Sequence, residues 1–255
     1  MIGREGVLAA VAPAAAVERT RDAFVRHARG EWEMPPKLYV DSPPGGDFRA
    51  MPARGGGFAI LKWVTSFPEN PARGLPVVAG ALLLSSTETG ALLAIIDCAS
   101  VTSLRTGAVA ALSAQALARD DARRAGIIGC GVNRSWAGRC LAAIGYSTGA
   151  CADVRPDAAV ALAEELGWDA GTREDALACG VVVTITPGAR PVVDAGDPER
   201  LRPRGGDARL PHVLGIYSGM LPCLRCGWAT RLVCRVRSAR ISFGRVSCGS
   251  ITSSM

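Results

Sequence analysis

A pair of glycines directly after a short apolar run carries the clearest chemical signal in the sequence. Residues 125–131 read AGIIGCG, so that Gly129 and Gly131 stand between a predicted strand over 126–128 and a predicted helix. The first glycine permits a tight turn, and the second lets the backbone approach a pyrophosphate at the start of the helix. The pattern predicts a dinucleotide-binding loop, although Arg134 stands where a third Gly or Ala is usual. An ordinary glycine-rich turn is the alternative.

A carboxylate at the end of the next predicted strand fits the same ligand. Asp153 lies 22 residues after Gly131, close to the spacing of about 20 at which an acidic residue reaches the ribose of a dinucleotide. Its carboxylate can accept a hydrogen bond from the 2′-hydroxyl and repel a 2′-phosphate, so we expect NAD as the cofactor, with NADP less favoured. The neighbouring Arg155 weakens that preference.

Lysine is rare enough here to be informative. Of the 29 basic residues only Lys37 and Lys62 are lysines, so arginine is the ordinary cation of this chain. A lysine ammonium is compact, and its pKa changes readily on burial, which suits it to a reactive site. Two chance surface lysines are the other interpretation of the same observation.

The elements that must position these residues follow two patterns. Over 5–29 the spacing of apolar residues predicts one amphipathic helix, and Ser100 begins a second helical pattern. Between them, short extended runs separated by Pro and Gly predict antiparallel strands. These predicted strands cover residues 37–40, 48–51, 58–65, 77–84 and 92–97.

From residue 125 strands and helices alternate, which is typical of a parallel sheet with crossover helices. Strands are predicted over 126–128, 148–154 and 181–186, and helices over 136–144 and 158–166. The fold class is therefore α/β, in which an α+β domain over residues 1–117 precedes an incomplete Rossmann-type domain over 118–203. Residues 204–255 form an atypical tail without sustained periodicity, apart from a short apolar run over 212–217.

Composition excludes several classes of protein. With 49% hydrophobic residues the chain is not disordered. The net charge of +6 arises in the tail, because residues 202–255 hold nine arginines and one acid, whereas the rest is nearly balanced. A balanced body with a basic tail is not a nucleic-acid groove, so we expect no nucleic-acid partner.

The compartment follows from the cysteines and the apolar runs. Nine cysteines without regular spacing favour reduced thiols in a cytoplasmic protein. No apolar run approaches the roughly 18 residues of a membrane span, so no membrane association is expected. Residues 7–17 faintly resemble a signal peptide, but Pro13 interrupts them.

Several segments in combination resemble the ornithine cyclodeaminase family, which includes mu-crystallin, archaeal-type alanine dehydrogenase and amino-acid dehydrogenases of siderophore and diaminopropionate biosynthesis. The resemblance covers roughly residues 5–203. Its segments are FRAMPA (48–53), LKWVTSFPENPARGLP (61–76), TGALLAIID (89–97), TSLRTGAVAAL (102–112), GIIGCG (126–131) and VVVTITPGARPVV (181–193).

The resemblance implies roles for individual residues. Lys62, Lys37 and Arg105 match basic residues of the family's substrate site, and Arg105 also matches a residue that reaches the nicotinamide. Met51 lies beside them in the family's MPA strand, with simple core packing as the alternative. Thr186 matches a threonine that contacts the cofactor. Val77 stands where the family often has another cofactor-contacting threonine.

The implied activity is NAD-dependent conversion of L-ornithine to L-proline with release of ammonia, by a homodimer whose first domain binds substrate and forms the dimer. NAD accepts a hydride from the α-carbon, the δ-amine attacks the resulting imine, and the hydride returns. One alternative is an amino-acid dehydrogenase or N-alkylating oxidoreductase of siderophore or diaminopropionate type. A second alternative is an inactive truncated family member.

The resemblance ends near residue 203. The family's proton-relay aspartate has no counterpart, because Asp207 falls in the wrong register, so the catalytic residue is unassigned. A reading-frame slip near residue 203 is the favoured interpretation of the tail, and a divergent genuine tail is another. A zinc site is a third interpretation, and its four candidate ligands are Cys223, Cys226, Cys234 and Cys248.

Overall fold

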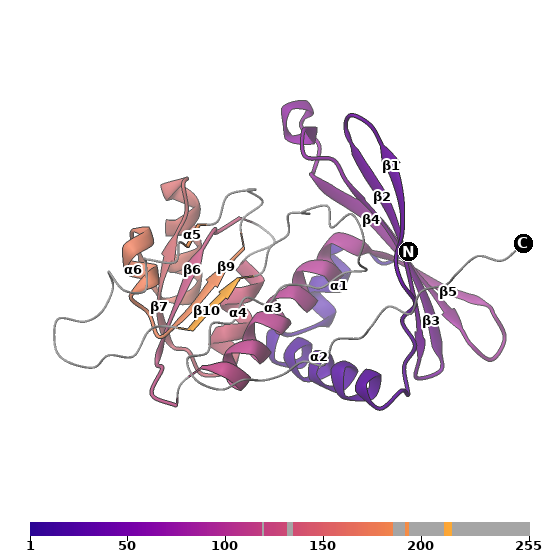
Figure 1. Cartoon of the computed structure of the whole chain (residues 1–255), viewed down its shortest axis with the longest axis horizontal. Coiled ribbons are helices and arrows are strands. Elements are labelled where there is room, and N and C mark those ends of the chain that lie inside the picture. Colours follow the sequence, from indigo (N-terminus) through magenta and orange to yellow (C-terminus); the bar gives the residue numbers. More distant parts are fainter. Residues whose placement is uncertain (119, 132–134, 186–191, 194–211, 216–255) are drawn as a thin grey trace, which may run out of the picture.

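The computed structural model describes residues 1–118, 120–131, 135–185, 192–193 and 212–215. It contains an antiparallel sheet and a parallel sheet, with helices between them (Figure 1). This is the mixed α/β architecture expected from the sequence. None of the helices in the described residues combines the length and the apolar character that a bilayer crossing requires.

The antiparallel sheet is built from five consecutive strands in the order β1-β2-β3-β4-β5. All five strands expected from the sequence are present, and β2 is longer than predicted. Their bounds are β1 Leu38–Ser42, β2 Gly46–Gly55, β3 Phe58–Ser66, β4 Val78–Ser86 and β5 Leu92–Asp97. A short 3-10 helix, η1 (Asn70–Arg73), lies in the connection from β3 to β4.

The predicted helix over 5–29 is wrong in one respect, because the structure has two helices there. The first is α1 (Arg4–Ala10) and the second is α2 (Pro13–Ala28). Ala12 between them has extended dihedrals of −69° and 152°. A proline disfavours the helical conformation of the residue before it, but its fixed φ suits the first turn of a helix. Pro13 therefore separates the two helices.

The parallel sheet has the strand order β10-β9-β6-β7-β8. When the five strands are numbered 1 to 5 along the chain from β6, and the sheet is read from the β8 edge, the order is 3-2-1-4-5. This order is the beginning of the Rossmann arrangement. The bounds are β6 Arg124–Ile128, β7 Thr148–Ala152, β8 Asp169–Ala170, β9 Val181–Thr184 and β10 His212–Gly215. The sequence missed β8, which has only two residues. β10 lies in the predicted tail, within the short apolar run over 212–217, and pairs in parallel with β9, so it covers that edge of the sheet.

Two layers of helices enclose the parallel sheet. On one face Ile127 and Val183 pack in a core with residues of α3 (Cys98–Leu117), α4 (Ser135–Ala143) and α5 (Pro156–Leu166). On the other face Val182 packs with residues of α6 (Arg173–Leu177). Like the strand β8, the helix α6 was not predicted from the sequence. The alternation of Val182 and Val183 between the faces is that of a buried parallel strand.

The long helix α3 connects the two sheets (Figure 1). Ala110 and Ala114 belong to the core of the parallel sheet, whereas Leu104, Ala108 and Ala111 pack with residues of α1, α2 and α4. Gly107 allows a close approach, because a Cβ atom at this position would lie 2.4 Å from the carbonyl oxygen of Trp136 in α4. The segments expected from the sequence to bind substrate and cofactor are thus joined through one helix.

Candidate active site

Lys62 lies on β3 and points toward α3. Its Nζ donates a hydrogen bond to Thr102 Oγ1 at 2.7 Å. The Thr102 hydroxyl in turn donates to the Cys98 carbonyl oxygen at 2.7 Å. Since the hydroxyl proton is used within the helix, Thr102 can only accept from the lysine. This chain of hydrogen bonds fixes one N–H of Lys62 and leaves its other two donors available for other acceptors.

Three other cations act on Lys62. Burial first, and then the positive charges of Arg105, Lys37 and Arg49, lower the pKa of Lys62 to about 8. The pKa of Lys37 is also lowered, by burial first and then by Arg105 and Arg49. Both lysines of the chain therefore lie in one electropositive site.

Arg105 and Met51 are placed by the elements that carry them. Arg105 follows Thr102 by three residues on α3, so both lie on the same side of the helix. Its side chain remains exposed to solvent. Met51 is the direct partner of Lys62 in the antiparallel register of β2 and β3, and such cross-strand pairs share a face of the sheet. The four residues expected to bind substrate are thus brought together around α3 and the first three strands.

Arg49 is a site residue that the sequence analysis missed. Its guanidinium binds the Asp47 carboxylate in a bidentate pair, with Nε at 2.5 Å from Oδ1 and Nη2 at 3.0 Å from Oδ2. It also lies over the Tyr39 ring, 5.7 Å from the centroid. The signal was available, because alternate residues of a strand share a face and Arg49 precedes Met51 by two.

The predicted dinucleotide loop lies at the carboxyl end of β6. Gly129 has a φ of 97°, a left-handed conformation that favours glycine. Its N–H donates to the Ala152 carbonyl oxygen at 2.8 Å, and Ile185 N–H donates to the Ile128 carbonyl oxygen at 3.1 Å. The loop therefore follows the first strand at the place where strand order reverses between β7 and β9, which is where ligands bind in such sheets.

Asp153 lies against this loop. Its Oδ2 accepts from Cys130 N–H at 2.6 Å, and its Oδ1 accepts from Arg155 N–H at 2.9 Å. Arg155 Nε also lies 3.6 Å from Oδ1, whereas Val154 between them is 99% exposed. The glycine loop and this carboxylate fit the pyrophosphate and ribose of a dinucleotide.

Other expected site residues lie outside the described residues. Thr186 is one of them, and Thr184 is the last residue of β9 that the structure describes as strand. Gly131 is described, but Arg134 is not. The four cysteines of the predicted zinc site are likewise outside the described part, so that interpretation stays a prediction.

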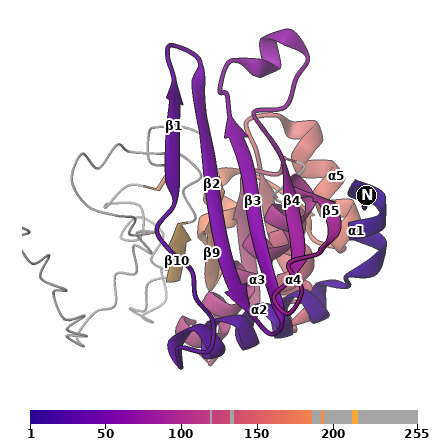
Figure 2. The ribbon, with the colours of Figure 1, turned by 90° about the vertical axis from the view of Figure 1, so that its right-hand side faces the viewer.

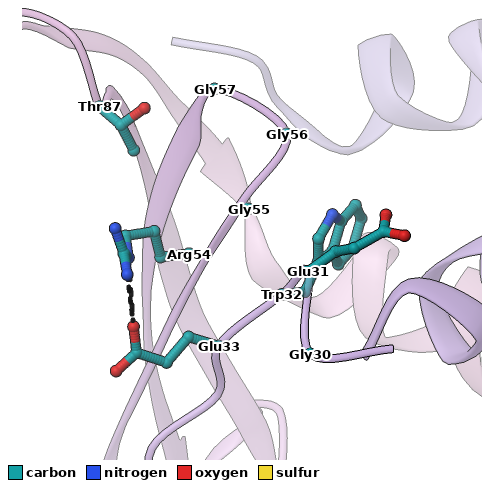
Figure 3. A pocket seen from close by; sticks show the side chains of 9 residues that line it. All are labelled: Gly30, Glu31, Trp32, Glu33, Arg54, Gly55, Gly56, Gly57 and Thr87. Atoms are coloured by element: carbon teal, nitrogen blue, oxygen red, sulfur yellow. Dashed lines mark hydrogen bonds and ion pairs between the residues drawn. The ribbon is translucent and has the colours of Figure 1, made fainter. Parts of the chain in front are cut away.

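A pocket of about 450 Å³ lies at the turn between β2 and β3 (Figure 3). Arg54 in this pocket pairs with Glu33 at 2.8 Å, and the Trp32 ring packs against Gly55. Both charged side chains of the pair are largely exposed. This pocket is at the opposite end of β2 from Asp47, so it is separate from the cationic site.

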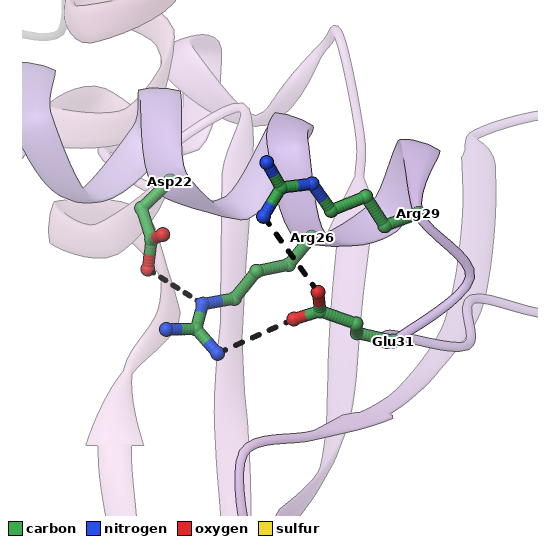
Figure 4. Close-up of polar contacts among 4 residues, drawn as sticks. All are labelled: Asp22, Arg26, Arg29 and Glu31. Atoms are coloured by element: carbon green, nitrogen blue, oxygen red, sulfur yellow. Dashed lines mark hydrogen bonds and ion pairs between the residues drawn. The ribbon is translucent and has the colours of Figure 1, made fainter.

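Exposed ion pairs fix the segment that leads from α2 to this pocket (Figure 4). Arg26 lies 2.9 Å from Asp22 and 3.4 Å from Glu31, and Arg29 lies 4.0 Å from Glu31. Glu31 follows the end of α2, so its pairs hold the chain beside the helix. Exposed pairs of this kind contribute about 0–1 kcal/mol each, and they indicate a structural role.

Comparison with known proteins agrees with this geometry. A sequence model of the ornithine cyclodeaminase/mu-crystallin family matches residues 4–196. Alanine dehydrogenase of Archaeoglobus fulgidus is 42% identical over 187 residues, which are 71% of this chain and 58% of that protein. L-lysine cyclodeaminase of Streptomyces rapamycinicus is 33% identical over 121 residues, which are 45% of this chain and 35% of that protein.

A solved structure gives the same result. The dimer of an archaeal alanine dehydrogenase with bound NAD superposes with a TM-score of 0.71 and 39% identity, over 77% of this chain and 63% of that one. The chain thus spans less than two thirds of the length of these relatives. The match over residues 4–196 includes the cationic site, the glycine loop and Asp153. The chain belongs to the ornithine cyclodeaminase/mu-crystallin family.

Proposed function

We propose that this protein is an NAD-dependent oxidoreductase that removes a hydride from the α-carbon of an amino acid, or returns one to the corresponding imine. The observation that carries the proposal is the electropositive site around Lys62, on a chain that also carries a dinucleotide loop. An amino-acid substrate brings a carboxylate, which cationic donors at fixed positions bind.

The residues of the first sheet and α3 hold the substrate. Lys62 and Arg105 bind the α-carboxylate, and Thr102 keeps the Lys62 ammonium in place through its 2.7 Å hydrogen bond. Lys37 and Met51 complete this site. A substrate held by its carboxylate presents its α-carbon in a fixed orientation, which lowers the entropic cost of the reaction.

The residues of the second sheet hold the cofactor. Gly129 and Gly131 leave room for the pyrophosphate, and Asp153 accepts the adenosine ribose hydroxyl and disfavours a 2′-phosphate. Arg105 and Thr186 are proposed to contact the cofactor as well. When bound, NAD supplies the hydride acceptor. The NAD in the archaeal alanine dehydrogenase structure supports this assignment.

The second candidate is cyclodeamination of ornithine to proline. It shares the first hydride transfer, after which the δ-amine attacks the imine, ammonia leaves and the hydride returns. The similarity to L-lysine cyclodeaminase supports it, and the similarity to alanine dehydrogenase supports net dehydrogenation.

We also propose a division into a substrate and dimerisation domain over 1–117 and a nucleotide domain over 118–203, with a second copy of the chain as partner. One face of the antiparallel sheet is turned away from the helices (Figure 2). Exposed apolar side chains such as Leu61, Trp63 and Ile95 lie on its strands. The dimer of the archaeal alanine dehydrogenase supports this arrangement.

The deciding experiment follows NADH with the full chain. A dehydrogenase produces one NADH for each amino acid consumed, whereas a cyclodeaminase consumes ornithine with catalytic NAD and accumulates none. Amino-acid consumption by neither route, with intact NAD binding, would contradict both candidates.

A further inference from the structure

The end of β7 presents an arginine to solvent, with a nearly buried carboxylate beside it. Asp153 follows the last residue of β7, and its side chain is 4% exposed, whereas the side chain of Arg155 is 68% exposed. Arg155 Nε lies 3.6 Å from Asp153 Oδ1. A ligand that approaches this end of the strand therefore meets the guanidinium together with the carboxylate.

The two oxygens of Asp153 face different parts of the protein. Oδ2 accepts from the N–H of Cys130 in the glycine loop at 2.6 Å, and Oδ1 accepts from the N–H of Arg155, just before α5, at 2.9 Å. The Arg155 guanidinium thus lies at the oxygen that is not bonded to the loop. In a Rossmann-type sheet the pyrophosphate lies at the loop and the adenosine ribose at the end of the next strand, where an acid binds the 2′-hydroxyl and an arginine accommodates a 2′-phosphate.

The charge of Arg155 changes what this end of the strand can bind. A carboxylate alone repels a 2′-phosphate: one unit charge about 5 Å from another of the same sign, in an effective dielectric of about 20 to 40, weakens binding roughly twenty- to three-hundredfold. Arg155 brings the opposite charge to 3.6 Å from the same carboxylate, so it offsets most of that repulsion. A guanidinium also matches the geometry of a phosphate, with which it forms two parallel hydrogen bonds.

We infer that the site takes NADP as well as NAD, and that Arg155 is the residue that decides how well it takes the 2′-phosphate. The inference rests on the proposed function, because it assumes that a dinucleotide binds at the glycine loop with its adenosine ribose at the end of β7. It adds a second cofactor to that function. Asp153 still disfavours a 2′-phosphate, but Arg155 reduces the difference between the two cofactors to less than tenfold.

The test measures binding and not turnover. 5′-AMP and adenosine 2′,5′-bisphosphate differ only by the 2′-phosphate, as NAD and NADP do. Calorimetric titration of the full chain at low ionic strength gives a dissociation constant for each of the four ligands. We expect each 2′-phosphorylated ligand to bind within tenfold of its partner. Added salt should weaken the 2′-phosphorylated ligands more, because the attraction between guanidinium and phosphate is screened.

A matched pair of variants localises the effect. For Arg155→Gln we expect NADP and adenosine 2′,5′-bisphosphate to bind at least tenfold more weakly, while the constants of NAD and 5′-AMP stay within threefold. Arg124→Gln is the control, because Arg124 is also an exposed arginine paired with an aspartate, Asp169 at 2.7 Å. Arg124 begins β6, at the opposite end of that strand from the glycine loop. The control should leave all four constants within threefold.

The outcomes separate the inference from the proposed function. If the unmodified chain binds NAD but binds NADP more than tenfold more weakly, the inference is overturned and the proposed function stands. Equal changes of NAD and NADP binding in Arg155→Gln, or no change in either, also overturn it, because Arg155 would then not read the 2′-position. Binding of neither dinucleotide contradicts both. If Arg155→Gln does not fold, the two ligand pairs on the unmodified chain still decide.

Discussion

At the scale of single residues, burial and neighbouring positive charges lower the pKa of Lys62. Its ammonium is hydrogen-bonded to Thr102 and lies among three other cations. In the proposed function, the substrate carboxylate relieves this repulsion, so the electrostatic energy of the site becomes more favourable when the carboxylate binds. The repulsion among these cations is thus part of the proposed binding of an anion.

Replacing Lys62 tests this role directly. For Lys62→Ala we expect kcat/KM for the amino acid to fall by about 10²-fold or more, because a charged hydrogen bond to the carboxylate contributes roughly 1.5–3 kcal/mol and orients the substrate as well. NAD binding, measured by fluorescence titration, should be unchanged within twofold. An Arg54→Ala variant serves as the control, and normal amino-acid turnover by Lys62→Ala would remove Lys62 from the site.

The pKa of Lys62 gives a second prediction at this scale. Because its pKa is about 8 instead of 10.5, the lysine loses its charge as the pH rises through 8, and the lowered pKa of Lys37 acts in the same direction. The inhibition constant of propionate, a carboxylate without an amine, should be constant below pH 7 and rise up to about tenfold per pH unit above pH 8. A Lys62→Arg variant should weaken this rise, since an arginine keeps its charge over the whole range.

Asp153 provides a third prediction, on cofactor choice. Asp153→Ala should weaken NAD binding more than NADP binding, because it removes both a hydroxyl acceptor and a charge that repels a 2′-phosphate. The same change removes the acceptor of Cys130 N–H, so part of the loss comes from the loop. Asp153→Asn retains an acceptor there and isolates the charge. Equal losses for both cofactors in both variants would place Asp153 away from the ribose.

At the scale of elements, α3 connects the segments that we propose to bind substrate and cofactor. Its Cys98, Thr102 and Arg105 lie at the cationic site, and its later alanines pack against the parallel sheet. The close contact at Gly107 holds α3 against α4. A small shift of this helix therefore changes the position of Lys62 through Thr102.

Two glycine-to-alanine variants measure that contact. In Gly107→Ala the new methyl meets the Trp136 backbone at 2.4 Å, whereas in Gly138→Ala of α4 it meets the tip of the Leu166 side chain at 2.5 Å. Both changes gain about 1 kcal/mol of helix propensity. Because a backbone cannot move aside as a side chain can, we expect Gly107→Ala to lower the free energy of unfolding by about 2–4 kcal/mol and Gly138→Ala by clearly less. Equal values from urea denaturation would contradict the role given to Gly107.

The elements also show what the sequence could predict. Alternation and turn residues were enough for the five antiparallel strands, and the alternating strands and helices were enough for β6, β7 and β9. The two-residue β8 and the five-residue α6 are too short to produce a periodic pattern. β10 was missed as a sheet strand because its pairing with β9 joins segments that are distant in sequence. The spacing of Arg49 and Met51 was enough to place both on one face of β2, but the pairing of Arg49 with Asp47 and the register with β3 could not be predicted from that spacing.

At the scale of the whole molecule, the antiparallel sheet has an apolar outer face that the described helices leave uncovered. None of the helices that the structure describes lies over it, and the sheet stands in front of those helices in Figure 2. We use the name outer face for six side chains that are 36–62% exposed: Leu38, Val40, Leu61, Trp63, Leu92 and Ile95. A continuous exposed apolar surface is typical of an interface between proteins.

This surface gives the last prediction, that the chain forms a homodimer through the outer face. Trp63 lies near its centre and stacks on Phe48 with centroids 5.7 Å apart. A charge there would be buried without a partner in the dimer, so Trp63→Glu should yield monomers in light scattering coupled to size exclusion. Val160→Glu, at a 43% exposed position on α5, is the matched control and should leave the mass unchanged. Lys62 lies on the same strand with its side chain on the opposite face, so a dimer that covers the outer face leaves the cationic site open to substrate. A Trp63→Glu protein that keeps the mass of the unmodified chain would exclude this face as the interface.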